Sequence, residues 1–408
     1  MVRMQPSRYE LVSAESALET ILALTPILGL EDVPLDEAPG RVLGENVLST
    51  ENVPAFDASM VDGYAVIAED DSPSRDVLAE ITAGRIGGVV VRPGTAARVM
   101  TGAPLPVGAN AVAMVEDAEE ANRQVRLSRS IRRGENVQPR GADLAVGQLV
   151  LEAGTVLGAP EIGLLATLGR ISVKAYRRPR IAVMATGDEL VDVAEQPGAG
   201  AIRDSNRPAL VASIRESGGV PVSLGIVRDD EAEQTAKIQM ALDQADVLVT
   251  SGGVSVGSRD LIKPILERLG QVHFGRVAVK PGKPLTFATV GPSLVFGLPG
   301  NPVSTLVTFE VFVRPALLKM QGRRWVLRPK VEVILEHDVK PSPDRTEYQR
   351  AVIRWDRGRL TARTTGSQAS SRLLSMVGAN GLVVVPPGEE KVSAGSTVPA
   401  LLTGQLLA

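Results

Sequence analysis

Residues 246–270 read DVLVTSGGVSVGSRDLIKPILERLG, and this stretch decides the class of fold. Its first residues, 246–249, are apolar and largely β-branched, as in a buried strand. Apolar residues then recur over 258–269 with the spacing of one helix face. The loop between strand and helix holds three glycines and three serines. Such a loop is either a plain connection or a cradle for an anion, because unpaired N–H groups point outward at a helix start.

Strands and helices alternate around this stretch. RIAVMAT (180–186) and VPVSLGIV (220–227) are typical of buried strands, while 206–219 and 230–245 have helical patterns. This alternation predicts a doubly wound parallel sheet, in which ligands bind at the carboxyl ends of the strands. Those ends carry TGDE (186–189), RDD (228–230) and the SGGVSVGSRD loop (251–260). The coincidence favours a binding site over a plain connection.

The remaining sequence predicts further domains. Ser13 is placed to cap a helix near the N-terminus. The region from about Val33 to Gly147 is punctuated by Pro and Gly, which is typical of short strands. Residues 155–169 predict a second helix that packs with the first. Beyond the basic segment 321–328, alternating patterns predict a small β domain. We therefore expect a multidomain α/β protein with four domains: a helical/linker domain (1–46 and 138–177), a β-rich insertion (47–137), the doubly wound domain (178–326) and a C-terminal β domain (327–408).

Composition narrows the chemistry. The chain has 408 residues, no cysteine, two histidines and a net charge of −3. The lack of cysteine excludes disulfides, iron–sulfur clusters and thiolate zinc sites, and the net charge gives no indication of nucleic acid as a partner. No apolar run approaches the roughly 18 residues needed to cross a bilayer, and the N-terminus has no signal-peptide core, so we expect a cytoplasmic protein. Catalysis must rest on carboxylates, Lys/Arg, hydroxyls, backbone amides or a hard metal such as Mg²⁺.

Two Gly/Pro turns follow later strands. KPGKP (280–284) holds Lys280 and Lys283 in a stiff loop suited to an oxyanion, although a solvated surface turn explains it equally well when taken alone. GLPGNP (297–302) places Asn301 to cap a helix that starts with Pro302. Helix capping accounts for Asn301 and Pro302 but gives no reason for the rigid Pro-Gly turn at 299–300.

Acidic and hydroxyl side chains gather at other turns. Glu189, Asp229 and Asp260 lie at strand ends of the predicted sheet, where their repulsion requires a cation or ligand unless helix dipoles stabilise them. Three segments of the β-rich region, 54–66, 99–117 and 132–148, carry Asp62, Thr101 and Asp143. Turn formation is an adequate structural reason for each of these segments by itself.

The order of these motifs resembles the MoeA/gephyrin E-domain family, the molybdopterin molybdenumtransferases of molybdenum cofactor synthesis. The resemblance covers nearly the whole chain and implies an elongated four-domain homodimer with a C-terminal β-barrel-like domain and sites between subunits. It implies insertion of molybdate into adenylylated molybdopterin with Mg²⁺ and release of AMP, with a transient partner in the adenylyltransferase of the same pathway. An adenylyltransferase on the same sheet and a gephyrin-type scaffold are the alternatives. The matching motifs are PAFDASMVDGYAV, MTGAPLPVGANAV, RGADLAVG, ATGDEL, IRDSN, SGGVSVGSRD, VKPGKP and GLPGNPVS.

The resemblance also implies roles for individual residues. It places catalytic positions on Asp62, Thr101, Asp143, Glu189, Asp229, Asp260 and Lys280, with Mg²⁺ held by Glu189 and Asp260. It places substrate binding on Ser251, Gly252, Gly253, Ser255, Gly257, Arg276, Lys283, Pro299, Asn301 and Pro302, and on Arg350 and Ser370, which are expected to complete the cleft from the partner subunit. Two positions depart from the family pattern: Ala58 stands where asparagine is commoner, and Arg276 where some members have lysine.

Overall fold

The computed structural model describes residues 9–84, 88–254 and 261–407. The contacts divide the chain into two compact units. The first comprises Met1–Asp32, Gly40–Gly44 and Lys174–Ala408, and the second comprises Val33–Pro39 and Glu45–Val173. The chain passes between them within β1 (Leu30–Pro34), on either side of residues 40–44, and within β12 (Ser172–Tyr176). Within the described ranges, no helix has the length and apolar character needed to span a membrane.

The first unit is built on a six-stranded sheet in the order β16-β13-β17-β21-β20-β18. The four strands that run parallel are β13 (Arg180–Thr186), β16 (Val220–Val227), β17 (Val247–Ser251) and β21 (Ser293–Leu298). β13 and β16 have the bounds predicted from the sequence, because each is a mostly apolar run that ends at polar residues. The doubly wound domain is therefore confirmed.

The last two strands at one side of the sheet differ from the expected parallel sheet. β20 (Thr286–Val290) runs antiparallel to β21, and β18 (Gln271–Phe274) runs antiparallel to β20. The physical reason is the turn at 291–292, where Gly291 takes a φ of 55° and reverses the chain at once. A reversal over two residues leaves no room for the helix that a parallel crossover needs.

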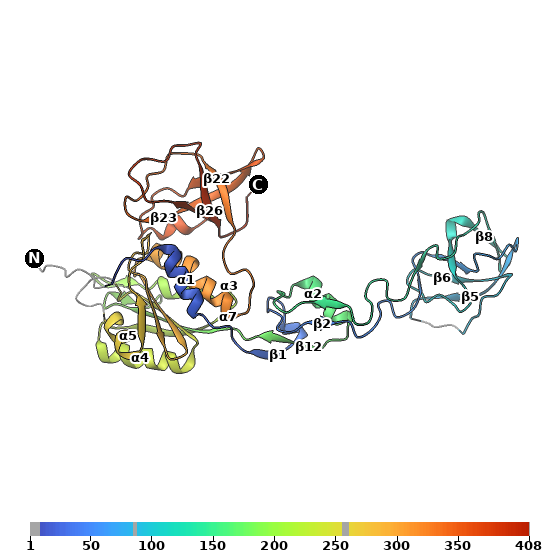
Figure 1. Cartoon of the computed structure of the whole chain (residues 1–408), viewed down its shortest axis with the longest axis horizontal. Helices are drawn as coiled ribbons and strands as arrows, with labels where there is room; N and C mark the ends of the chain where they lie inside the picture. The colour runs from blue at the N-terminus through green and yellow to red at the C-terminus, as the bar shows by residue number, and fades with distance from the viewer. Residues whose placement is uncertain (1–8, 85–87, 255–260, 408) are drawn as a thin grey trace, which may run out of the picture. The chain divides into compact units, whose positions relative to one another are not determined.

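Helices cover both faces of this sheet (Figure 1). Because side chains alternate along a strand, Val183 and Val249 face one layer while Met184 and Leu248 face the other. The first layer contains α3 (Asn206–Glu216) and the run α6 (Pro302–Thr308), η3 (Phe309–Val313) and α7 (Arg314–Met320). The second layer contains α4 (Glu231–Gln244) and α5 (Ile262–Leu269).

The N-terminal helix α1 (Ala14–Leu24) packs differently from the prediction. Its cap is as expected, since the Ser13 side chain accepts a hydrogen bond from the Ser16 N–H at 3.0 Å. Its buried residues Ala14, Ala17 and Ile21 belong to the core of the doubly wound domain, together with η3 and α7. The expected packing against the helix at 155–169, α2 (Ala159–Thr167), is wrong: α2 belongs to the second unit.

The C-terminal part of the first unit is a closed barrel. The strand order is β23-β24-β22-β26-β25, and β25 pairs again with β23, which closes the sheet on itself. The apolar interior includes Val333, Ile353 and Val383. This confirms the expected β-barrel-like domain. Its strands are β22 (Lys330–Leu335), β23 (Thr346–Asp356), β24 (Arg359–Thr364), β25 (Gly381–Val385) and β26 (Thr397–Leu402), with the short helix η4 (Leu373–Met376) before β25.

A short strand of the doubly wound domain joins this barrel. β19 (Val279–Lys280) runs parallel to β23, with Lys280 opposite Glu347 in the register. The KPGKP loop is therefore anchored by the barrel at its first lysine. The remaining short strands of the first unit are β14 (Leu190–Val191) and β15 (Ile202–Arg203).

The second unit is β-rich, as predicted. Its main sheet has the order β7-β4-β6-β5-β9-β8, and Tyr64 and Ala65 of β4 point into apolar clusters on opposite faces. The main strands are β4 (Gly63–Val66), β5 (Arg75–Ile81), β6 (Thr95–Val99), β7 (Ala111–Met114), β8 (Ala118–Ala121) and β9 (Gln124–Leu127). The smaller elements are β2 (Val47–Leu48), β3 (Ala58–Ser59), β10 (Val137–Gln138), β11 (Leu149–Leu151), η1 (Leu35–Glu37) and η2 (Val115–Asp117).

Candidate active site

A polar hollow of about 880 Å³ opens at the carboxyl edge of the doubly wound sheet. We call it the edge hollow. Its wall is formed by loops that follow β13, β17 and β21, because the carboxyl ends of parallel strands meet at one edge. The predicted site residues in its lining are Glu189, Asp229, Ser251, Gly252, Gly253, Pro299, Asn301 and Pro302.

The two glycines after β17 are required by the backbone. Gly252 and Gly253 have φ values of 94° and 66°, in the left-handed region that side chains disfavour. A Cβ on Gly252 would lie 2.6 Å from the Thr186 carbonyl oxygen. The loop therefore passes close against the end of β13, and its backbone, with no side chain in the way, borders the hollow. Ser255, Gly257 and Asp260, which the sequence also predicts for this site, lie outside the described residues.

Asn206, at the first position of α3, joins two walls of the edge hollow. Its side-chain amide donates to the Ser251 hydroxyl and to the Gly300 carbonyl, both at 2.7 Å. One side chain thus ties the glycine loop to the GLPGNP turn. Asn206 lies in the IRDSN motif, the one sequence signal that pointed to it, but no role was predicted for it from that motif.

Glu189 and Asp229 are the described carboxylates that the sequence predicts for this hollow. No group of three or more Asp, Glu, His or Cys side chains within the described parts of the chain is arranged to hold a metal ion. Mg²⁺, however, commonly uses one or two carboxylates together with phosphates of a substrate. The described donor set therefore fits Mg²⁺ bound jointly with a phosphorylated ligand.

A second, cationic hollow of about 570 Å³ adjoins the first and shares Pro284, Asn301, Ser304 and Ser371 with it. We call it the lysine hollow, because Lys280 and Lys283 line it. Arg345 of the C-terminal barrel lines it too and was missed by the sequence analysis. Three cationic side chains around one small hollow are suited to an oxyanion.

Arg276, predicted to help to hold the oxyanion, is absent from the linings of both hollows. Its backbone carbonyl accepts a hydrogen bond from the Val12 N–H at 3.2 Å, which ties this segment to the start of the chain. The direct contact at Arg276 therefore stays a prediction, while Arg345 is a cationic side chain that does line the lysine hollow. A cationic side chain near a motif in sequence does not have to face the same hollow.

Arg350 is buried rather than presented to a partner subunit. Its side chain is 0% exposed, and its Nε and Nη2 atoms both donate to the Ser375 hydroxyl at 3.2 Å. Nη2 also donates to the Ala369 carbonyl at 3.4 Å. Burial lowers the pKa of Arg350 to about 10. Arg350 does not itself line either hollow as the described residues form them, but its side chain holds Ala369, which lines the lysine hollow.

Ser370, expected to come from a partner subunit, lies beside the turn of its own chain. Its hydroxyl accepts from the Asn301 side-chain amide at 3.1 Å, and its carbonyl accepts from the Val303 N–H at 3.1 Å. Asn301 does occupy the cap position of α6, but its side chain makes no capping hydrogen bond. The expected side-chain cap is therefore replaced by a link between the GLPGNP turn and the barrel segment.

In the second unit, Asp62 and Thr101 lie together. The Thr101 N–H and hydroxyl donate to Asp62 Oδ1 at 2.7 and 2.9 Å. These two hydrogen bonds, the backbone one first, hold the pKa of the exposed Asp62 carboxyl below its ordinary value. Asp143, in the same unit, is exposed, and its N–H donates to the Val53 carbonyl at 2.9 Å.

Removing the Thr101 hydroxyl is expected to raise the pKa of Asp62. Thr101→Val deletes one of the two donors, so the ionised carboxylate loses part of its stabilisation and the pKa rises towards its ordinary value. It stays below that value because the backbone donor remains. Carboxyl carbon NMR titration measures the change. Thr95→Val, which removes a hydroxyl bonded to Arg92, is the control; an unchanged Asp62 titration in Thr101→Val would contradict the assignment.

A polar hollow at the edge of a doubly wound sheet, beside a cationic hollow, is typical of a protein that binds a phosphorylated small molecule. Comparison with known proteins specifies the family. Three family models match in order: MoeA N-terminal region (domain I and II) at residues 12–169, a probable molybdopterin binding domain at 182–319, and MoeA C-terminal region (domain IV) at 332–403.

Relatives match along most of the chain. A molybdopterin molybdenumtransferase of Haemophilus influenzae is 37% identical over 90% of this chain and 92% of its own length. A gephyrin of Dictyostelium discoideum is 36% identical over 98% of this chain, which spans 63% of that longer protein. The crystal structure of a molybdopterin biosynthesis MoeA protein from Pyrococcus horikosii has a TM-score of 0.84 and 33% identity, covering 97% of this chain and all of its own. The chain belongs to the MoeA family of molybdopterin molybdenumtransferases.

Proposed function

We propose that this protein inserts molybdate into adenylylated molybdopterin and releases AMP. The observation that carries the proposal is the pair of adjoining hollows: one bordered by a glycine loop at a sheet edge, the other lined by Lys280, Lys283 and Arg345. The first suits a phosphorylated pterin nucleotide and the second suits a dianion. The lining residues that the two hollows share support the binding of two ligands next to each other, as the reaction requires.

The chain's own residues would act by binding and positioning. Backbone at Gly252 and Gly253 borders the phosphates, and Asn206 fixes the distance between the glycine loop and the GLPGNP turn. The cationic side chains of the lysine hollow hold molybdate against the pterin. Glu189 and Asp229 would hold Mg²⁺, with Asp260 assigned to the same role by sequence. Bound Mg²⁺ supplies charge neutralisation for the pyrophosphate. The dithiolene sulfurs of the pterin substrate would become the ligands of the inserted molybdenum, so the chain needs no cysteine to bind it.

The test is a single-turnover reaction of the full-length protein with adenylylated molybdopterin, with and without molybdate and Mg²⁺. AMP release that depends on molybdate supports the proposal. Formation of the adenylylated pterin from ATP and molybdopterin would instead identify an adenylyltransferase. Tight binding with no turnover under any condition would identify a scaffold. The lysine hollow favours the first result, because Arg345 comes from the barrel and a doubly wound domain alone lacks it.

We further propose a cytoplasmic homodimer that receives its substrate from the pathway's adenylyltransferase. Support comes from the family, whose sequence motifs recur in both units of this chain. Asp62 and Thr101 belong to one unit, while Glu189 and Lys280 belong to the other. Asp143 belongs to the same unit as Asp62.

The dimer has a direct test. Sedimentation equilibrium is expected to give twice the chain mass of 43.0 kDa. Mixing the inactive variants Asp62→Asn and Glu189→Gln, one from each unit, under conditions of subunit exchange is expected to restore AMP release, if residues of two subunits serve one reaction. A monomer, or exchange shown by mass spectrometry without recovered activity, would contradict the shared reaction.

A further inference from the structure

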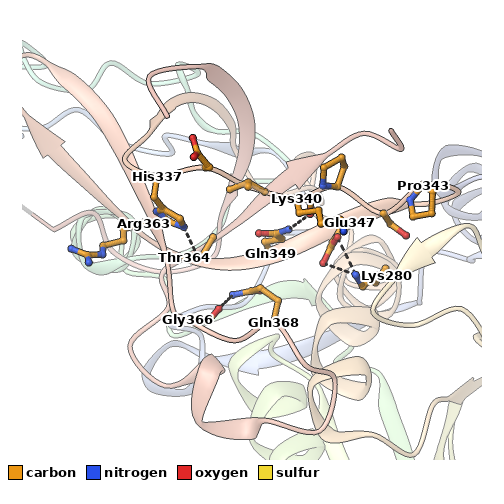
Figure 2. Close-up of a pocket in the computed structure, with 14 residues that line it drawn as sticks. Lys280, His337, Lys340, Pro343, Glu347, Gln349, Arg363, Thr364, Gly366 and Gln368 are labelled. Carbon is orange, nitrogen blue, oxygen red and sulfur yellow. Dashed lines mark hydrogen bonds and ion pairs between the residues drawn. The ribbon is translucent and has the colours of Figure 1, made fainter. Parts of the chain in front are cut away.

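We propose that Glu347 is a positioning residue for the oxyanion: its carboxylate sets where the Lys280 ammonium stands and opposes the negative charge of the anion. The inference rests on the proposed function, since it takes the lysine hollow as the molybdate site. Glu347 belongs to none of the motifs that predict the site. It is drawn beside Lys280 in Figure 2.

Glu347 is a buried carboxylate with a specific partner. Its side chain is 2% exposed, and both of its carboxylate oxygens lie 3.3 Å from Lys280 Nζ. The Lys280 side chain is 42% exposed, so the ammonium has the carboxylate on one side and solvent-accessible space on the other. A carboxylate this deeply buried is costly unless it is paired, and the structure pairs it with the predicted ligand of the oxyanion.

The backbone fixes this pair. Lys280 lies opposite Glu347 in the parallel pairing of β19 with β23, so both residues sit on the barrel sheet. Lys280 lines the lysine hollow and also a hollow of about 730 Å³ on the barrel, lined by His337, Lys340 and Arg363 among others. Figure 2 shows this barrel hollow, with the Lys280–Glu347 contact at one end. The ammonium therefore stands at the boundary between two hollows, and Glu347, which lines the barrel hollow but not the lysine hollow, draws it towards the barrel side.

The geometry gives Glu347 two opposed effects on an oxyanion. Both contacts are longer than the 2.7–2.9 Å typical of strong charge-assisted hydrogen bonds, so the ammonium is oriented but keeps hydrogen-bonding capacity for a second acceptor. At the same time, the carboxylate stands just behind the ammonium and repels a dianion bound in front of it. Loss of the charge should therefore strengthen anion binding while loosening the orientation of the ammonium.

The test is Glu347→Gln in the full-length protein. We expect the dissociation constant for molybdate, measured by calorimetry, to fall by roughly threefold to tenfold because the repulsion is removed. We expect kcat for AMP release to fall by about tenfold because the ammonium is less well placed. A merely structural role would not tighten binding while slowing turnover. Glu332→Gln removes one carboxylate from β22 of the same barrel, outside all three hollows, and should change neither quantity.

Each outcome decides the inference. Unchanged or weaker molybdate binding in a folded Glu347→Gln variant overturns it. If that variant does not fold, Glu347→Asp keeps the charge one methylene away: molybdate affinity should stay near that of the unmodified protein while kcat falls, and normal turnover would overturn the inference. If the unmodified protein releases no AMP, the proposed function has failed, while the binding measurement still decides whether Glu347 acts on the oxyanion.

Discussion

Lys280→Ala is expected to raise the molybdate concentration for half-maximal AMP release by about thirtyfold, which corresponds to roughly 2 kcal/mol for a lost hydrogen bond to a charged group. The substitution is best made in a chain that also carries Glu347→Gln. Lys280 is the partner of the buried Glu347 carboxylate, and its removal alone would leave that charge unpaired and destabilise the fold. The Glu347→Gln single variant is then the reference.

The control for this experiment is Lys340→Ala. Lys340 has the same charge but lines the barrel hollow and not the lysine hollow. It should leave the molybdate dependence nearly unchanged, because exposed charges beyond close contact are screened over about 8 Å at physiological salt. A separate titration of adenylylated molybdopterin completes the test. If pterin binding weakens as much as molybdate use, Lys280 binds the phosphates and the oxyanion site lies elsewhere.

Asn206→Ala is expected to lower kcat/KM for AMP release by about thirtyfold to a hundredfold, since two hydrogen bonds each contribute about 1–1.5 kcal/mol. Both bonds measure 2.7 Å and link the glycine loop to the GLPGNP turn. Without them the two walls of the edge hollow move independently, and the phosphates lose a fixed site. Asn206→Asp tests the cause, because it keeps the shape but cannot donate to Ser251 and Gly300.

Asn301→Ala is the matched control for Asn206. It also removes an amide from the lining of the edge hollow, but that amide donates to the Ser370 hydroxyl instead of linking the glycine loop to the GLPGNP turn. We expect a smaller loss of kcat/KM, and no faster hydrogen exchange at the Gly252 amide, which donates to Leu298. Equal losses in the two variants would mean that Asn206 does not couple the two walls.

The sequence predicted the strands of the doubly wound sheet well and the partners of its helices poorly. RIAVMAT and VPVSLGIV have apolar, strand-type patterns that end at polar turns, so local pattern sets their bounds. The apolar face of α1 shows that the helix packs against something but does not identify its partner. Small Ala14 and Ala17 fit close to the helix run 302–320, which only the tertiary fold reveals.

Site residues divide in the same way. Backbone requirements are local, so the glycines of the SGG loop were identifiable from sequence, and their left-handed φ values agree. The direction of a side chain, in contrast, depends on the tertiary fold and cannot be read from the local sequence. Arg350 and Arg345 lie on or beside one strand, yet the first is fully buried and the second lines the lysine hollow. Asn206 was overlooked because an Asn after a strand is common, and the two bonds that distinguish it come from residues 45 and 94 positions away.

The pairing of β19 with β23 has a consequence for modular exchange between proteins. Because the first lysine of KPGKP is part of the barrel sheet, the barrel is not an independent cassette appended to the doubly wound domain. In a chimera with a barrel from another protein, the KPGKP loop loses β23, the strand with which β19 pairs. The foreign barrel can replace it only if it offers an unpaired strand edge at the same register and a carboxylate at the position of Glu347. Recombination within this architecture should therefore succeed when the crossover lies before residue 278, so that lysine and carboxylate travel together, and fail when it lies in the 321–328 segment.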